Sequence, residues 1–313
     1  MTHELSPAGA VPLTHWGVLR AQGPDATSFL QGQLTNDVAT LTMSQLRLAG
    51  FCSAKGRLQA SFLVWRAGPD ELLLACAASV LAATLKRLSM FLLRAKCKLS
   101  DASADAGVKV VLTGIAGPEV DLLMPGAAVW SKLDASQAAL LRLPDVDGVP
   151  RCIVAGLAQG TTVGATPLAL DTWRALEVRS GIALIEAATV DQFVPQMLNF
   201  ELVGGVDFQK GCYPGQEIVA RSQYRGTIKR RMFVFTCDAP AQPGQEVFHS
   251  ADAAQPAGMV VNAAPAGAGS VALVEVKLAA VDQGSLHLGT VNGPVMRAGT
   301  QPYALPSDAS LLA

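Results

Sequence analysis

The chain has 313 residues, half of them hydrophobic, and its 24 lysines and arginines nearly balance its 25 aspartates and glutamates. A formal net charge of −1 leaves no global field that would attract nucleic acid or an anionic membrane, so any such attraction has to be local. Apolar runs are interrupted by charged residues or glycine before they reach the roughly 20 residues that a membrane span needs.

The amino-terminal segment, MTHELSPAGAVP, has neither the basic nor the apolar region of a secretory signal. We therefore expect residues 1–12 to form a loose leader and the protein to be cytoplasmic.

Residues 13–105 predict a first α+β unit. Residues 15–23 alternate as a strand, and 24–38 open with Pro-Asp and then carry apolar residues at helical spacing. Three strands joined by glycine-containing turns are predicted across 45–77, followed by an amphipathic helix over 79–96. Strands followed by a helix that packs back on them indicate an α+β unit rather than a doubly wound sheet.

A second α+β unit is predicted over 106–235. Its pattern is a strand at 108–115, a short helix at 117–124, a strand at 148–156 and a helix over 170–182. The long loop that follows is of the kind that often carries a functional site.

Residues 236–313 predict an all-β domain. Short β-rich runs are separated by proline, glycine and alanine, which is typical of a small barrel or sandwich.

The six cysteines are widely spaced, with no Cys-x-x-Cys and no Cys-His pair, which argues against a zinc or iron-sulfur site formed by neighbouring residues. Cys212 differs from the others because it lies in a turn, QKGCYPGQEIVAR, just before a predicted helix. The helix N-terminus and Lys210 would stabilise its thiolate, so Cys212 is a candidate nucleophile, sulfur acceptor or transient metal ligand. Alternatively, it packs as a small residue beneath the turn. The nearest histidine is distant in sequence, which argues against a Cys-His hydrolase.

A basic run follows Cys212. It contains five cations and no acid: Arg221, Arg225, Lys229, Arg230 and Arg231. Such a run indicates either a local anion site or a solvated basic face. A ligand carboxylate is the better candidate for such a site, because the one aromatic residue of the run, Tyr224, is too little for stacking RNA bases.

The sequence around Cys212, together with the basic run, resembles that of the YgfZ-type folate-binding proteins. These are relatives of the aminomethyltransferase (T-protein) of the glycine cleavage system. Their K-G-C-[FY]-x-G-Q-E motif stands here as Lys210, Gly211, Cys212, Tyr213, Gly215, Gln216 and Glu217. The likeness continues through residues 29–38, 53–57, 173–182 and 192–208. It is dense from residue 13 to residue 231 and looser beyond.

This resemblance implies an α+β fold of two interleaved ferredoxin-like units and a C-terminal β-barrel around a channel that would hold tetrahydrofolate, with no permanently bound metal. Members of the family act, through the cysteine motif, as accessory factors in assembling or repairing iron-sulfur clusters. The enzymes served modify tRNA, and cells are thereby protected under oxidative stress. The expected partners are folate and iron-sulfur client or assembly proteins, without a membrane and without direct contact with nucleic acid.

The resemblance also implies the site residues. Cys212 and Lys210 would act chemically. The residues expected to bind folate are Asn36, Asp37, Lys55, Arg57, Glu177, Arg179, Phe193, Gln196, Asn199, Tyr213, Gln216, Glu217, Arg221 and Arg225. The residues alone also allow structural roles. Asn36 and Asp37 would then cap and end a helix, and Lys55 and Arg57 would be exposed charges of a hairpin. Trp16 and Trp173 fit a core better than a ligand-stacking site.

Two positions depart from the T-protein pattern. Ala60 and Ser61 stand where T-proteins carry acidic residues, and because neither can act as a carboxylate, we do not expect an aminomethyltransferase. Arg179 stands where T-proteins use a glutamate to read the pteridine, and a guanidinium offers only donors. Glu177, Glu186 or Asp191 would have to replace it. Three hypotheses remain: the accessory factor, a folate-dependent one-carbon transferase, and an RNA- or partner-binding module.

Overall fold

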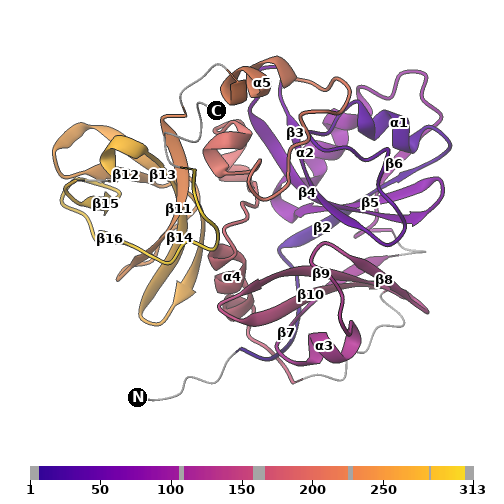
Figure 1. Ribbon diagram of the computed structural model, residues 1–313, viewed down its shortest axis with the longest axis horizontal. Coiled ribbons are helices and arrows are strands. Elements are labelled where there is room, and N and C mark those ends of the chain that lie inside the picture. Colours follow the sequence, from indigo (N-terminus) through magenta and orange to yellow (C-terminus); the bar gives the residue numbers. More distant parts are fainter. Residues whose placement is uncertain (1–6, 106–108, 158–165, 225–227, 282, 307–313) are drawn as a thin grey trace.

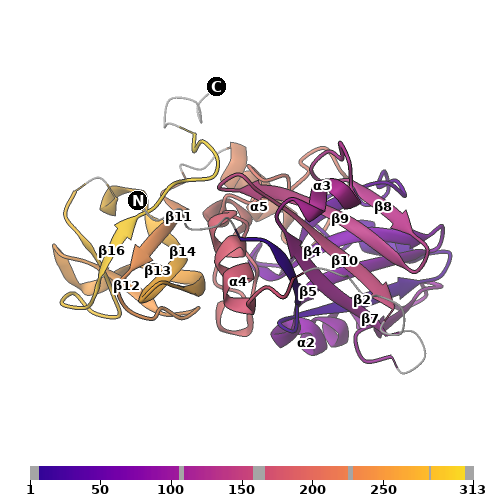
Figure 2. The same ribbon diagram turned by 90° about the horizontal axis from the view of Figure 1, so that it is seen from below.

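The computed structural model describes residues 7–105, 109–157, 166–224, 228–281 and 283–306. Two five-stranded antiparallel sheets and a closed six-stranded barrel make up the protein. Helix α4, Leu170–Arg179, stands between the barrel on one side and the two sheets on the other (Figures 1 and 2). The predicted α+β class with a C-terminal barrel is confirmed.

The first sheet has the strand order β3-β4-β5-β2-β6. Its strands are β2 (Trp16–Gln22), β3 (Leu46–Cys52), β4 (Leu58–Gly68), β5 (Glu71–Ala77) and β6 (Lys98–Asp101). Helices α1 (Ala26–Gln31) and α2 (Ala78–Ser89) cover its outer face. Side chains alternate along a strand, so Leu19 packs toward the helices while Val18 points the other way.

The second sheet has the order β1-β7-β10-β9-β8 and faces the first sheet across the largest core. Its strands are β1 (Gly9–Pro12), β7 (Val110–Ala116), β8 (Lys132–Ala135), β9 (Ala138–Val146) and β10 (Val149–Leu157), with α3 (Glu119–Leu123) on the outer face. Strand β1 pairs with β7, Gly9 lying opposite Ala116. The expectation of a loose leader through residue 12 is therefore wrong for residues 9–12, which tie the start of the chain to the second sheet.

The barrel consists of β11 (Arg230–Cys237), β12 (Glu246–His249), β13 (Asp252–Ala266), β14 (Gly269–Lys277), β15 (Leu286–Leu288) and β16 (Val295–Ala298), with the 3-10 turn η3 (Leu278–Ala280). Because β11 pairs with β14 along its whole length, the barrel begins at Arg230 rather than at the predicted residue 236.

Several elements differ from the predicted ones. Helix α1 is only six residues long and gives way at Gly32 to irregular chain, and α2 ends at Ser89 instead of residue 96. Strands β6, β8, β9 and β15 were not predicted. Between α4 and the barrel the chain forms η1 (Ala187–Thr189), η2 (Pro195–Leu198) and α5 (Gln216–Tyr224). Among the described helices, none combines the length and apolar content that a bilayer crossing requires.

Candidate functional site

The loop that carries Cys212 is held by two glycines in contact. Gly215 has a φ of +78°, and Gly56, in the turn between β3 and β4, has a φ of +68°. A Cβ on Gly215 would lie 2.4 Å from the carbonyl oxygen of Ser53 and 2.6 Å from the Gly56 backbone. Glycine alone adopts this φ and this approach without strain. The loop therefore packs on the first unit, which corrects its predicted assignment to the second.

Lys210 fixes the other side of the loop. Its ammonium donates hydrogen bonds to the carbonyl oxygens of Gln31, at 2.5 Å, and Leu34, at 2.7 Å, just where α1 ends. It also lies 4.9 Å from the centre of the buried Tyr213 ring. Burial lowers the pKa of Lys210 to about 8, while nearby anionic groups oppose the shift. Lys210 thus anchors the loop, and its donors are directed at carbonyl oxygens.

Cys212 is exposed, whereas four of the other cysteines are buried and Cys97 is half-buried. The alternative that Cys212 packs beneath its turn is therefore wrong. Helix α5 begins at Gln216, so the prediction that the cysteine precedes a helix N-terminus is confirmed. Gln216 is half-buried and Glu217 and Arg221 are exposed on that helix. The thiol is accessible from solvent on an anchored loop.

A cavity, here called the inner chamber, lies between the two sheets and α4. Its walls include Trp16, Leu48, Ser61, Trp130 and Ile182, and the carboxylate of Glu177 reaches it. The centre of a water molecule can occupy about 50 Å³ of this space. Apolar and aromatic walls with few polar groups are typical of small-molecule sites.

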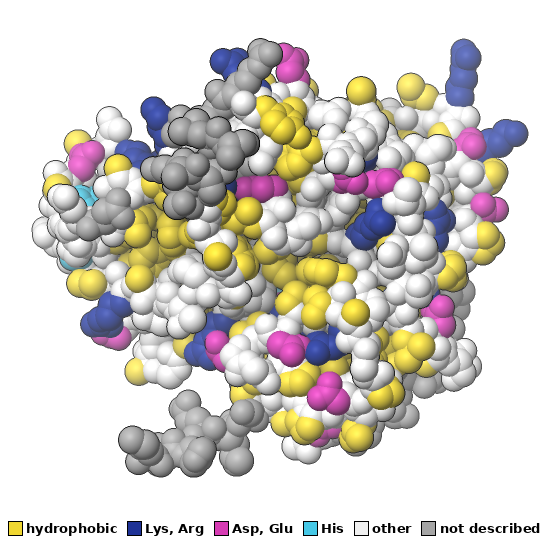
Figure 3. All heavy atoms as spheres, viewed as in Figure 1, with side chains coloured by type: hydrophobic (Ala, Val, Ile, Leu, Met, Phe, Trp, Pro, Cys, Tyr) yellow, Lys and Arg dark blue, Asp and Glu magenta, His cyan; other side chains and the backbone are white. Residues whose placement is uncertain are grey.

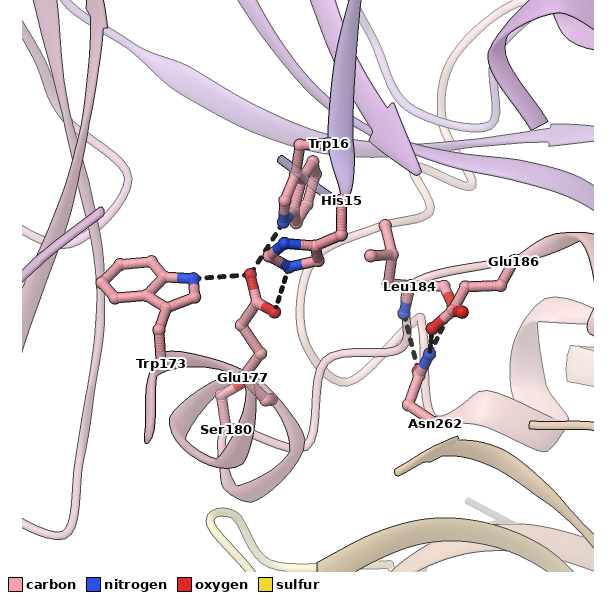
Figure 4. A network of polar contacts seen from close by, with 8 residues as sticks. All are labelled: His15, Trp16, Trp173, Glu177, Ser180, Leu184, Glu186 and Asn262. Carbon is pink, nitrogen blue, oxygen red and sulfur yellow. Dashed lines mark hydrogen bonds and ion pairs between the residues drawn. The ribbon is translucent and has the colours of Figure 1, made fainter. Parts of the chain in front are cut away.

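Glu177 is the polar centre of the inner chamber (Figure 4). Its Oε1 accepts hydrogen bonds from the indole N–H of Trp16, at 2.8 Å, and of Trp173, at 2.7 Å. Its Oε2 lies 2.7 Å from Nε2 of His15. Trp173 and Glu177 are four residues apart on α4, so they share one face of the helix. A carboxylate has about four acceptor positions, and three are used here.

Arg151 adds a buried cation beside this acid. Its guanidinium carbon lies 5.7 Å from the centre of the Trp173 ring, and Nε and Nη2 donate to the Pro144 carbonyl at 3.2 and 3.1 Å. Burial lowers the pKa of Arg151 to about 10, against the attraction of the Glu177 carboxylate. The inner chamber therefore contains both an acceptor and a donor group.

The segment from residue 182 to 186, which closes one side of the inner chamber, is bonded from both sides. The hydroxyl of Ser61 accepts the Ile185 N–H at 2.9 Å. On the barrel, the Asn262 amide donates to Leu184 O at 2.7 Å and to Glu186 Oε1 at 3.0 Å (Figure 4). Ser61, which stands where T-proteins carry an acid, thus has a structural partner. Its neighbour Ala60 is fully buried in the core between the first sheet and helices α1 and α2.

A second cavity, here called the outer groove, adjoins the inner chamber through two shared residues, Leu48 and Trp130. Its walls also include Asn36, Arg47 and Gly204. The centre of a water molecule can occupy about 450 Å³ of it. The two spaces thus lie side by side, with Leu48 and Trp130 lining both of them.

Asn36 and Asp37 mainly hold the backbone. Asn36 Nδ2 donates to the carbonyls of Leu48 and Gly204, at 2.7 and 2.6 Å. Asp37 Oδ2 accepts the hydroxyl of Thr40 at 2.7 Å. Burial would raise the pKa of Asp37, but its bonds to residues 39 and 40 prevail and lower it. The structural alternative accounts for both residues, although Asn36 also reaches the outer groove.

Of the thirteen described residues expected to bind folate, only Asn36 and Glu177 line either cavity. Lys55 is exposed in the turn beside α5, and Arg57 Nη1 donates to Gln192 O at 2.5 Å. Gln196 Nε2 donates to Val219 O at 2.8 Å, and Asn199 Nδ2 to Met232 O at 2.7 Å. Gln196 and Asn199 thus join the η2 segment to α5 and to the barrel.

Phe193 and Arg179 also lie elsewhere. Phe193 is buried in the core between the sheets, where its carbonyl accepts the Leu58 N–H at 2.8 Å. Arg179 pairs with Asp147 at 3.6 Å and lines a different groove, between the β9–β10 hairpin and the barrel. The expectation that Arg179 takes the place of the T-protein glutamate in the channel is wrong, and Glu177 occupies the chamber.

The basic run does not form one anion site. Arg230 pairs with Glu275, and Arg231 donates to Glu201 Oε1 at 2.5 Å. Arg221 and Lys229 are exposed, and Arg225 lies outside the described residues. On the face shown in Figure 3, Lys and Arg side chains are scattered among acidic ones. Two of the five cations are thus committed to internal partners.

Comparison with known proteins settles the family. The GCVT N-terminal domain model matches residues 5–154. The tRNA-modifying protein YgfZ of Edwardsiella ictaluri is 32% identical over 248 residues, which cover 72% of this chain and 70% of that protein. The chain belongs to the YgfZ family. The Klebsiella pneumoniae YgfZ is 30% identical over 253 residues, covering 76% and 74% of the two chains. The predicted resemblance is confirmed.

The fold of this YgfZ-family chain is that of an aminomethyltransferase. The glycine cleavage system aminomethyltransferase T from Bartonella henselae superposes with a TM-score of 0.73 at 17% identity, over 95% of this chain and 86% of that one. An identity this low shows the architecture alone.

The sequence did not single out His15, Trp130 and Arg151 as site residues, and it treated Trp16 and Trp173 as core. One available signal was the arginine inside an otherwise apolar strand, VPRCIVAG, since a buried arginine needs bonding partners. Among the described residues, no group of three or more His, Cys, Asp or Glu side chains could hold a metal ion.

Proposed function

We propose that this protein binds a reduced folate in the inner chamber and outer groove and serves, through the thiol of Cys212, the iron-sulfur enzymes that modify tRNA. The observation that carries the proposal is the exposed cysteine on a loop anchored at both sides. Gly215 packs on Gly56 on one side, and Lys210 binds the end of α1 on the other. The printed name of the relatives, tRNA-modifying protein, supports the assignment to tRNA modification.

A single exposed thiol sets limits on the chemistry. In the described part of the chain no group of three or more His, Cys, Asp or Glu side chains could hold a metal ion, so Cys212 by itself offers one ligand to an iron atom or one acceptor for sulfur. One ligand is too few for a resident cluster, which usually has four. Cys212 therefore acts by transient contact, with a cluster, iron or sulfur as cargo.

The lining of the two cavities and their relative sizes support a folate as the ligand. Trp16 and Trp130 would flank a flat ring, and the fourth acceptor position of Glu177 would take one N–H of the pterin edge. Because the inner chamber is far smaller than the outer groove, the ring would enter the chamber and the tail would lie in the groove. A bound reduced folate would supply a one-carbon unit or reducing equivalents from its ring.

The geometry does not support the other two hypotheses. One-carbon transfer would need a carboxylate near Ser61, and the hydroxyl present there is already bonded to the Ile185 N–H. RNA binding through the basic run would need free cations, and Arg230 and Arg231 are paired with Glu275 and Glu201.

The role of the thiol is tested by complementation. Cells that lack the protein would receive wild type, Cys212→Ser or Cys97→Ser, and the cluster-dependent modified nucleosides of tRNA would be measured by mass spectrometry. We expect wild type and Cys97→Ser to restore them and Cys212→Ser to fail at equal protein level. Full restoration by Cys212→Ser would refute the role of this thiol.

Folate binding is tested separately by titrating tetrahydrofolate and following tryptophan fluorescence. A ring between Trp16 and Trp130 should quench emission, and Trp130→Phe should reduce the response and weaken binding. Trp65→Phe is the matched control, since Trp65 is buried in the core and lines neither cavity. An unchanged emission spectrum at millimolar ligand would contradict the folate assignment.

A further inference from the structure

A groove along α2 shares no residue with the inner chamber, the outer groove or the Cys212 loop. It is called here the α2 groove. Its apolar lining includes Val80, Ala83 and Met90 from α2 and its C-terminal end, together with Phe51 of β3 and Val190. The centre of a water molecule can occupy about 470 Å³ of it. Helix α2 lies on the outside of the molecule (Figure 2), so the α2 groove opens to solvent.

Exposed apolar side chains continue the α2 groove beyond the helix. Met90 is 68% exposed, Phe91 42% and Leu93 92%. Leu93 also has a φ of +39°, an uncommon conformation for a branched residue. Neighbouring exposed apolar residues of this size mark interaction sites more often than isolated ones do.

The same segment is cationic. Residues 86–98 contain no aspartate or glutamate, and five exposed cations: Lys86, Arg87, Arg94, Lys96 and Lys98. Lys86 and Arg87 lie on the rim of the α2 groove itself. A partner that fits this rim carries negative charge, because complementary potentials favour encounter and fix orientation.

The floor of the α2 groove holds an unused acceptor. Gln59 Oε1 is buried and has no hydrogen-bond partner among the described residues. A buried acceptor without a partner is unfavourable, and a donor from an occupant would satisfy it. A peptide backbone N–H or side-chain amide is such a donor.

We propose that the α2 groove docks an acidic segment of a partner protein that places an apolar side chain between Val80 and Val190. A phosphate backbone would satisfy the cations, but it would leave the apolar walls unfilled, and Phe91 is a single stacking surface. A lipid surface would accept the exposed apolar residues Met90, Phe91 and Leu93. It would not fill a concave groove that contains a buried acceptor. A polypeptide with acidic residues around one apolar anchor satisfies all three features.

Site-specific photo-crosslinking in cells tests this inference. The full chain would carry p-benzoylphenylalanine at Ala83, with the same probe at Ala82 as control. Both alanines are exposed on α2, but only Ala83 lines the α2 groove. Mass spectrometry would identify the linked segment. We expect an adduct from Ala83 and not from Ala82, with an acidic segment that contains an apolar residue.

The identified segment would then be synthesised and its binding followed by fluorescence anisotropy. Lys86→Glu together with Arg87→Glu should weaken binding by roughly tenfold or more, with the far-UV spectrum unchanged. Equal adducts from both positions, no adduct from Ala83, or a linked segment without acidic residues would overturn the proposal. Adducts with RNA, or with phosphatidylglycerol from the membrane, would overturn it in favour of those ligands. Because Cys212 is not involved, this result and the complementation result are independent.

Discussion

Removal of the Glu177 carboxylate should destabilise the protein strongly, because this one acid accepts hydrogen bonds from three side chains in two distant parts of the chain. In Glu177→Ala the indole N–H of Trp173, a fully buried residue, loses its acceptor. An orphaned buried donor costs about 1–3 kcal/mol. The bonds to Trp16 and His15 are partly exposed and contribute about 1 kcal/mol each. The expected loss is therefore about 3–5 kcal/mol.

Glu177→Gln is the matched variant. Its amide oxygen can still accept both indole N–H groups, and its NH₂ can donate to Nε2 of His15 in the tautomer that leaves this nitrogen free. We expect a loss of about 1 kcal/mol. Urea denaturation would be followed by far-UV circular dichroism, since the substitution itself alters tryptophan emission. If Glu177→Ala lost no more stability than Glu177→Gln, the account of Glu177 as the polar centre would be refuted.

Three further predictions concern other parts of the molecule. Gly215→Ala should speed amide hydrogen exchange in the Cys212 loop, because an alanine at this φ costs roughly 1–2 kcal/mol and its Cβ would meet the Ser53 carbonyl. Gly211→Ala is the control and should not speed exchange, because its Cβ would meet nothing within 4 Å. Equal exchange rates in the two variants would contradict the glycine contact. Burial raises the pKa of Cys76 from 9.0 to about 12, so the unfolded chain loses this proton first and the free energy of unfolding falls as pH rises from 9 to 12. In Cys76→Ala the free energy of unfolding, measured by urea denaturation at pH 9 and at pH 12, should fall less between these two pH values. An unchanged fall would show that this thiol does not contribute to it. Arg231→Met leaves the buried Glu201 carboxylate without its partner and should cost about 3–5 kcal/mol in urea denaturation; a loss under 1 kcal/mol would show that Glu201 takes up a proton at little cost.

Much of the fold follows from local sequence. The strands predicted over 45–77 are apolar runs bounded by glycine-containing turns, and these are β3, β4 and β5. Pairings between distant segments are harder to infer. Strand β1 is four residues long, and it exists because β7 offers a free edge. Strands β8 and β9 contain alanine, leucine, charged residues and a proline but hardly any residue with strong strand preference, so tertiary pairing decides their conformation.

The candidate site divides in the same way. The motif around Cys212 predicts an accessible thiol before a helix, since Pro-Gly turns and helix starts are local features. The inner chamber is assembled by contacts across the chain, such as that of Glu177 with His15, 162 positions away. The spacing of Trp16 and Trp173 does not indicate that both donate to one acid, nor does that of Trp16 and Trp130 indicate that both line one cavity. Glu177 lines the inner chamber and Arg179 pairs with Asp147 outside it, because a shift of two positions on α4 moves a side chain to another face of the helix.

The Cys212 loop and the outer groove are parts of one continuous structure. From the groove wall at Gly204, the chain runs beside residues 34–37: Gly204 O accepts from Asn36 at 2.6 Å, and Asp207 N donates to Thr35 O at 3.0 Å. Lys210 closes this series on Leu34 O at 2.7 Å, two residues before Cys212. Contiguous bonded networks of this kind can carry coupling between sites. The wall of the outer groove and the base on which the thiol is held are therefore joined by direct hydrogen bonds to one segment, residues 34–37.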